Sequence, residues 1–135
     1  MKVIILSLLI VHAFGFMYQP DNKKIAVGQE FKLRPGQRAI LRVEGLTIEF
    51  GSVAEDSRCP IGVDCIWQGN AKVLLKMHRK GKDARTLELN TTLEPRSASF
   101  PGYVVEMVQL EPYPKANAST KKEDYVVTLI VRKQS

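Results

Sequence analysis

The sequence predicts an all-β protein, a single antiparallel β-sandwich (or a partly open barrel) of about seven or eight short strands. Apolar and polar residues alternate with period two through most of the chain. Turn residues interrupt this alternation every eight to twelve residues or so, as in sandwiches and barrels. No helix-length window keeps apolar residues at i, i+3, i+4 and i+7. The 135 residues suit one domain.

The first half of the chain supplies three expected strands, over residues 29–33, 38–43 and 46–50. Residues 34–37 join the first two strands, and their central Pro35 and Gly36 suit a tight turn. In the third strand Leu46, Ile48 and Phe50 share one face, because side chains alternate across a strand. Thr47 and Glu49 take the other face.

The second half supplies further strands over residues 71–78, 86–91, 103–110 and 125–131. A basic turn over residues 79–83 joins the first two of these. We expect a loop around Pro95 and Pro101 before the third, and a polar loop over residues 115–124 before the last. The chain shows no repeat and no interdomain linker.

The amino terminus has the layout of a secretory signal peptide. Lys2 precedes the apolar run VIILSLLIV, and Ala13 and Gly15 place small residues before a cleavage point after residue 15. The run is too short to cross a bilayer, and no second apolar segment follows it. We therefore expect a signal peptide over residues 1–15 and a mature domain over 16–135, with 16–24 as an extended arm. The mature protein is expected to be secreted (periplasmic if bacterial), without a transmembrane segment, and monomeric.

Two cysteines, Cys59 and Cys65, are expected to pair outside the cytosol. Closing this short ring contributes about 2.4 kcal/mol in the chain-entropy model, so the bond mainly fixes the shape of its loop. If the next strand begins at Cys65, then Trp67, Gly69 and Ala71 point the same way, followed by Val73 and Leu75. We interpret this set as a core packed around Trp67 and the disulfide. The alternative is that Trp67 belongs to an exposed recognition edge.

The pattern Asp56-Ser57-Arg58-Cys59-Pro60, four residues, then Cys65-x-Trp67-x-Gly69-x-Ala71 resembles the signature of a family of small secreted or lipoprotein β domains found mainly in bacteria. The resemblance extends over nearly the whole mature chain, including residues 50–53 and 125–127. It implies export and the β fold, and no established biochemical activity. Many members begin with a lipid-modified cysteine, which is not found here, so we expect no lipid tether.

The charge distribution and the lack of a recognisable catalytic group argue against nucleic-acid binding and against an enzyme. The net charge is +6, which favours acidic partners only weakly. The basic cluster over residues 78–85 contains no aromatic side chain, so we expect no nucleic-acid binding. After cleavage His78 is the only histidine, and it stands beside Lys80 rather than near a carboxylate. Both cysteines are expected in a disulfide, so neither is available as a thiolate nucleophile. His78 is not placed as a general base for a serine nucleophile either, and we therefore predict that the protein is not an enzyme.

The sequence contains weak candidates for a metal site and two candidates for glycosylation. Zinc on Cys59, Cys65 and His78 would need reduced thiols, and Asp56 is better explained as capping a turn beside Arg58 than as a calcium ligand. We therefore predict no metal and no cofactor. Asn90 and Asn117 fit the N-glycosylation pattern, which is relevant only in a eukaryotic source.

The leading hypothesis is a secreted, non-enzymatic binding module for an extracellular protein or glycan. Its expected surface combines the cysteine segment with the basic turn, namely Asp56, Arg58, Asp64, Gln68, Arg79, Lys80, Lys82 and Arg85. On this interpretation Arg58→Ala leaves folding nearly intact and harms binding. The alternatives are a secreted hydrolase (protease) inhibitor that presents a disulfide-rigid loop and, third, a small hydrolase.

Overall fold

The computed structural model describes residues 21–135, so the predicted signal peptide and residues 16–20 of the arm lie outside the described residues. Short 3-10 turns occur at Arg42–Glu44 and Lys122–Asp124. No helix in the described part is long and apolar enough to cross a membrane. The strands are β1 (Asn22–Lys24), β2 (Glu30–Leu33), β3 (Arg38–Leu41), β4 (Leu46–Asp56), β5 (Ala71–Arg79), β6 (Arg85–Asn90), β7 (Ser97–Phe100), β8 (Tyr103–Glu111) and β9 (Val126–Lys133).

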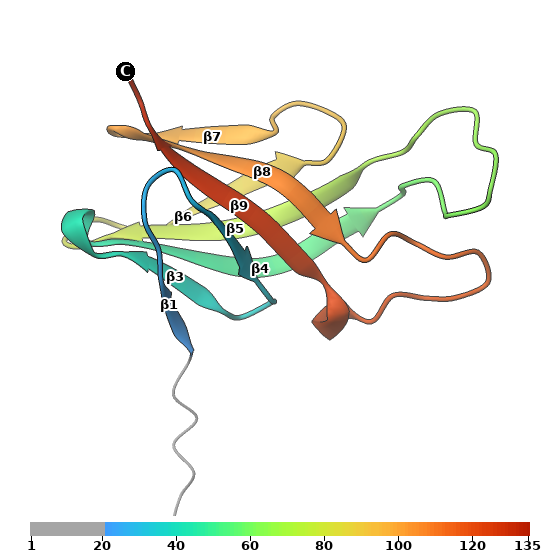
Figure 1. The fold of residues 1–135 in the computed structure, drawn as a ribbon, viewed down its shortest axis with the longest axis horizontal. Coiled ribbons are helices and arrows are strands. Elements are labelled where there is room, and N and C mark those ends of the chain that lie inside the picture. The colour runs from blue at the N-terminus through green and yellow to red at the C-terminus, as the bar shows by residue number, and fades with distance from the viewer. Residues whose placement is uncertain (1–20) are drawn as a thin grey trace, which may run out of the picture.

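The strands form two sheets. One sheet has the order β1-β3-β4-β5-β6 and the other β2-β9-β8-β7. Figure 1 shows β8 and β9 crossing over β4 and β5, so the sheets stack as two layers. The predicted all-β sandwich is therefore confirmed, and the two sheets do not close into a barrel. Every strand pair is antiparallel except β1 with β3, which is parallel.

The core fills the space between the two sheets, as the alternating pattern requires. Along β5 the buried positions alternate with exposed or half-buried ones, starting from Ala71 and continuing through Val73 and Leu75. The opposing layer contributes the inner faces of β8 and β9. The largest fully buried side chains include Leu33, Leu46, Ile48, Phe50, Leu75, Leu89, Leu110 and Leu129.

Two strands were not expected from the sequence. β7 lies in the segment predicted as a loop around Pro95 and Pro101, and its four residues are too few to show a clear period. It forms because β8 offers a pairing edge, with Ala98 opposite Val105. β1 lies in the expected extended arm and has only polar side chains, so its pairing with β3 supplies the order.

The longest hairpin, β4–β5, positions the site described next. β4 continues past Phe50 to Asp56, through two register shifts, at Phe50/Ser52 and Val53/Glu55. Such bulges change which side chains face inward, which hides the strand from a simple period-two pattern. Asp56 pairs with Ala71, so residues 57–70 form the connection, hereafter the disulfide loop.

Candidate interaction surface at the disulfide loop

The base of the disulfide loop continues the β4–β5 ladder for two more steps. Ser57 N donates to Asn70 O at 2.8 Å, and Cys59 N donates to Gln68 O at 2.9 Å. The Ser57 hydroxyl adds a hydrogen bond of 2.9 Å to the same Asn70 carbonyl. The loop therefore leaves the sandwich as a paired stem rather than as two free chains.

The predicted disulfide closes the loop just above this stem. Cys59 and Cys65 are bonded, with Cα atoms 6.0 Å apart. Between them, Val63 N donates to Pro60 O at 3.2 Å, and Gly62 has φ +80°, as the third position of a type II turn requires. The short ring thus has little freedom to change shape.

Gly69 determines how the chain leaves the loop. Its φ is +72°, and a Cβ built on it would lie 1.9 Å from Ser57 O. No other residue type fits, because both the backbone angle and the approach of the Ser57–Arg58 backbone exclude a side chain. The left-handed turn at Gly69 also breaks the alternation that β5 would otherwise carry back to Cys65.

This break corrects the sequence interpretation of Trp67. Trp67 was expected to face the core with Ala71, but its side chain is 53% exposed. The strand begins at Ala71 rather than at Cys65. The alternation of side chains between the two faces of the strand therefore does not continue backwards across Gly69 to Trp67. Gly69 itself is buried, as the close contact with the Ser57 carbonyl requires.

The prediction that Arg58 lies on the interaction surface is also wrong. Arg58 is 3% exposed and lies between the two sheets. Its Nε and Nη2 donate to the two carboxylate oxygens of Asp56 at 2.8 and 2.7 Å. Nη1 donates to Leu110 O at 2.7 Å and Nη2 to Pro112 O at 2.8 Å. Arg58 therefore connects the disulfide loop to the end of β8, which makes it a structural residue.

Asp56 completes this buried network. Its carboxylate also accepts a hydrogen bond of 2.9 Å from the Tyr125 hydroxyl and one of 3.3 Å from Arg58 N. The latter is the turn-capping contact expected from the sequence. Burial alone would raise the pKa of Asp56, but the hydrogen bonds from Arg58 and Tyr125 and the charge of Arg58 outweigh it and hold that pKa below its ordinary value.

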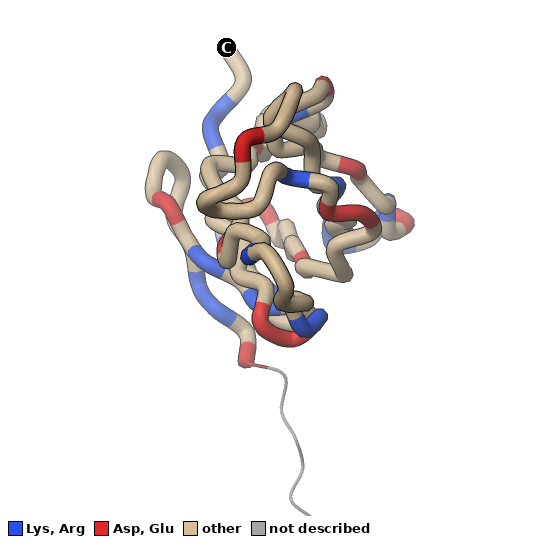
Figure 2. Tube along the Cα trace, turned by 90° about the vertical axis from the view of Figure 1, so that its right-hand side faces the viewer, with Lys and Arg blue, Asp and Glu red and all other residues tan. Residues whose placement is uncertain are grey.

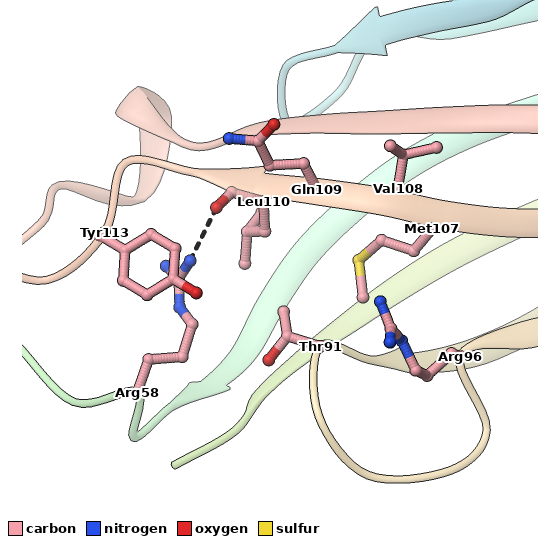
Figure 3. A pocket seen from close by; sticks show the side chains of 8 residues that line it. All are labelled: Arg58, Thr91, Arg96, Met107, Val108, Gln109, Leu110 and Tyr113. Atoms are coloured by element: carbon pink, nitrogen blue, oxygen red, sulfur yellow. Dashed lines mark hydrogen bonds between the residues drawn. The ribbon is translucent and has the colours of Figure 1, made fainter. Parts of the chain in front are cut away.

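Figure 3 shows the small cavity beside Arg58. The Tyr113 ring covers the guanidinium, 4.5 Å from its carbon to the ring centroid, and Arg96 and Met107 lie at the other end of the cavity. The cavity measures about 130 Å³. This is small beside the roughly 300 Å³ at which small-molecule pockets begin. Since the Arg58 donors are already engaged by protein acceptors, we assign this cavity no ligand.

A second loop supports the disulfide loop from the side. The β8–β9 connection, residues 112–125, lies next to it at the same end of the molecule (Figure 1). Ile61 N donates to Pro114 O at 3.0 Å. Figure 2 looks onto this end and shows acidic and basic positions interspersed along the backbone. The disulfide loop itself carries only Arg58 and Asp64 as charged residues.

The tip of the disulfide loop exposes a set of apolar side chains. Ile66 is fully exposed and Trp67 half exposed, and Ile61 and Val63 are also exposed. Scattered surface apolar residues are ordinary, but four within seven residues of one fixed loop are not. We call Ile61, Val63, Ile66 and Trp67 the apolar tip. The sequence signal for the apolar tip was the apolar content of the Cys59–Trp67 segment. The alternation of side chains along the expected strand assigned part of this segment, Trp67, to the core.

The remaining predicted surface residues divide into two groups. Asp64 and Gln68 are exposed on the disulfide loop. The basic residues of the β5–β6 turn lie at the other end of β5, where Arg79 is half-buried and the others are exposed, namely Lys80, Lys82 and Arg85. The structure therefore does not bring the two predicted surfaces together.

The two glycosylation candidates differ in accessibility. Asn90 is 3% exposed, and its side chain bonds Asn70 and the Pro95 carbonyl, so the folded protein gives a glycan no access there. This corrects the sequence prediction for Asn90, which lies at a strand end but faces inward beside Asn70. Asn117 is exposed in a turn and stays a candidate.

Residues 21–135 contain no group of three or more His, Cys, Asp or Glu side chains arranged to hold a metal ion. Searches of protein-family models, curated proteins and solved structures give no match to this chain. The class defined by the fold is thus an all-β sandwich with a disulfide-closed loop at one end.

The buried network predicts a specific pH dependence of stability. Because the folded-state pKa of Asp56 is lowered from 3.8, Asp56 stabilises the fold fully above its unfolded pKa and loses this contribution as the pH falls through the folded pKa. We expect the unfolding free energy, measured in urea, to drop steeply below about pH 4. Asp56→Asn should be less stable at pH 7 and show a shallower acid loss. Parallel pH profiles of the two proteins would contradict this assignment.

Proposed function

We propose that this protein is an exported, non-enzymatic binding module that uses the apolar tip of its disulfide loop to hold a partner protein. The observation that carries the proposal is the exposure of Trp67 and Ile66 on a loop whose base is fixed. Exposed apolar surface has no stabilising role in the free protein. It becomes favourable when a partner covers it.

The rigidity of the loop supports a binding role. Binding orders flexible segments at a cost in entropy, so a loop already held in shape loses less on association. Here the disulfide, the turn at Gly62 and the buried Arg58 all restrict the loop before any partner arrives. Tryptophan is also the residue type most enriched among side chains that dominate binding energy.

The composition of the tip favours a protein partner with an apolar cleft. Within the disulfide loop, Asp64 is the one charged residue besides buried Arg58, and Lys115 of the neighbouring loop forms a β-bridge with Ile61. We expect binding to depend weakly on salt, because apolar burial rather than charge drives it. A polyanionic glycan would instead require a cluster of cations, and the disulfide loop has none besides buried Arg58.

A secreted hydrolase inhibitor is the second candidate, and one observation favours it. The loop projects a fully exposed residue, Ile66, from a stem closed by a disulfide. A side chain presented in this way can enter an enzyme's specificity pocket. Adding the protein to a panel of extracellular proteases distinguishes the two ideas, since an inhibitor lowers substrate turnover in proportion to occupancy and a plain binding module does not.

Binding can be tested with the only tryptophan in the chain as a reporter. We expect the wild-type protein to capture a partner from the extracellular fraction of its source, and the purified partner to shift Trp67 emission to shorter wavelength. Ile66→Ser with Trp67→Ser should reduce capture about tenfold or more, since each buried anchor contributes on the order of 1–2 kcal/mol.

The matched control is Val27→Ser, which removes another partly exposed apolar side chain from a segment outside the disulfide loop. It should capture as well as the wild type. Equal capture by the double variant, or binding only to glycans, would refute the role of the tip. Far-UV circular dichroism and melting temperatures should match in all three proteins, because the tip is exposed.

A further inference from the structure

A second cavity opens at the end of the sandwich opposite the disulfide loop. It lies between the β5–β6 turn and the β7–β8 turn, at the far end of β5 in Figure 1. Its volume is about 400 Å³. This falls within the roughly 300–1,000 Å³ range of ligand pockets. Met77 and Phe100, both almost fully buried, line its apolar part.

Two arginines occupy inward-facing positions beside this cavity. On β5, Met77 faces the core, and Arg79 follows it with the same parity. On β6, Arg85 lies directly opposite Met77 in the ladder. It is therefore on the same face of the sheet as Leu87 and Leu89, the face toward the core. Sandwich positions of this kind usually hold apolar residues. Both arginines line the cavity, where Arg79 is half-buried and Arg85 is exposed.

The charges around the cavity are not balanced. Arg79 is paired with Glu44 at 2.7 Å and donates to Pro101 O at 3.4 Å. Lys82 and Arg85, in contrast, form no ion pair within residues 21–135. Asp83 is the only carboxylate that lines the cavity within this part of the chain. Cationic groups therefore exceed acidic ones at an opening whose floor is apolar.

We propose that this cavity binds a small amphipathic anion, a carboxylate with a compact aliphatic body. The carboxylate would lie against Arg85 and Lys82, and the aliphatic part would cover Met77 and Phe100. Charge complementarity selects the anionic head, and burial of apolar surface holds the body. The site is independent of the apolar tip, which lies at the other end of the molecule.

Octanoate is a suitable probe, and 1-octanol is its uncharged counterpart of the same chain length. We expect octanoate to give saturable amide shifts in a ¹H–¹⁵N spectrum, confined to residues 77–85 and 100–103. 1-Octanol should bind at least about tenfold more weakly, because it lacks the charged hydrogen bonds. Arg85→Gln should weaken octanoate binding by a similar factor and leave 1-octanol binding unchanged.

Arg34→Gln provides the control, since it removes the same charge from the exposed β2–β3 turn, outside the cavity. It should bind octanoate as the wild type does. If Arg85→Gln melts at a much lower temperature, Lys82→Gln in the exposed turn provides the same comparison. Absence of saturable shifts, equal binding of the two probes, or full binding by both cavity variants would overturn the proposal and leave the arginines as caps that close the sandwich end.

Discussion

Gly69→Ala is expected to lower the free energy of unfolding by about 3 kcal/mol or more. Two costs add at this position. The left-handed conformation at φ +72° is unfavourable for any residue with a Cβ, and that Cβ would lie 1.9 Å from Ser57 O. The obstacle is backbone in a paired stem, so it cannot move aside as a flexible side chain would. Relief requires breaking the Ser57–Asn70 and Cys59–Gln68 hydrogen bonds.

Gly62→Ala separates these two costs. Gly62 lies in the same loop with φ +80°, but a Cβ there has no atom within 4 Å. Its alanine variant should lose only about 1 kcal/mol, the conformational cost alone. Urea unfolding of both variants, followed by circular dichroism, measures the difference. Equal losses would show that the approach of Ser57 to Gly69 does not constrain the loop.

The sandwich was predictable because most strands follow the period-two pattern. β2, β3, β8 and β9 lie close to their expected ranges. The pattern failed where tertiary pairing rather than sequence determines the strand, as in β1 and β7. It also failed beyond Phe50, where two bulges in β4 shift the alternation. In each case the missing information was the neighbouring strand.

The site was less predictable than the fold, for a related reason. The sequence predicted the cysteine segment as the place of a candidate surface, but it exchanged the burial of two residues within that segment. Trp67 was assigned to the core and Arg58 to the surface, whereas the structure buries Arg58 and exposes Trp67. Side chains alternate between two faces only along a continuous strand, and one glycine with a left-handed backbone conformation interrupts that strand. Arginine is rarely buried, and the four acceptors that bury Arg58 come partly from residues more than fifty positions away.

These exchanged roles give the sequence motif a physical meaning. Asp56 and Arg58 form the buried anchor, Cys59 and Cys65 close the ring, and Gly69 permits the close crossing. Each of these residues builds the loop, and Arg58 and Gly69 are buried within it. Trp67 is the one large motif residue that the scaffold does not use. The motif thus specifies a rigid support and one presented aromatic side chain.

Arg58→Met is expected to destabilise the protein by about 3–5 kcal/mol, the usual cost of leaving one buried charge unpaired. The variant removes both hydrogen bonds to Asp56 and leaves the carbonyls of Leu110 and Pro112 without their donor. Tyr125 alone cannot compensate the buried carboxylate. Arg58→Lys should recover only part of the loss, because one ammonium cannot reproduce the fork of donors that reaches both sheets. This expectation reverses the sequence interpretation, in which Arg58→Ala leaves folding intact.

Arg38→Met is the matched control, because Arg38 also pairs with a carboxylate, Glu49 at 2.9 Å, but on the exposed side of β3 and β4. Its loss should be below about 1 kcal/mol, as for surface ion pairs in general. Urea unfolding at pH 7 gives both values. A small loss for Arg58→Met, comparable to that of Arg38→Met, would mean that the disulfide and the stem hold the loop without the buried anchor. In that case the rigidity that the proposed tip binding requires would have to come from Cys59–Cys65 and Gly69 alone.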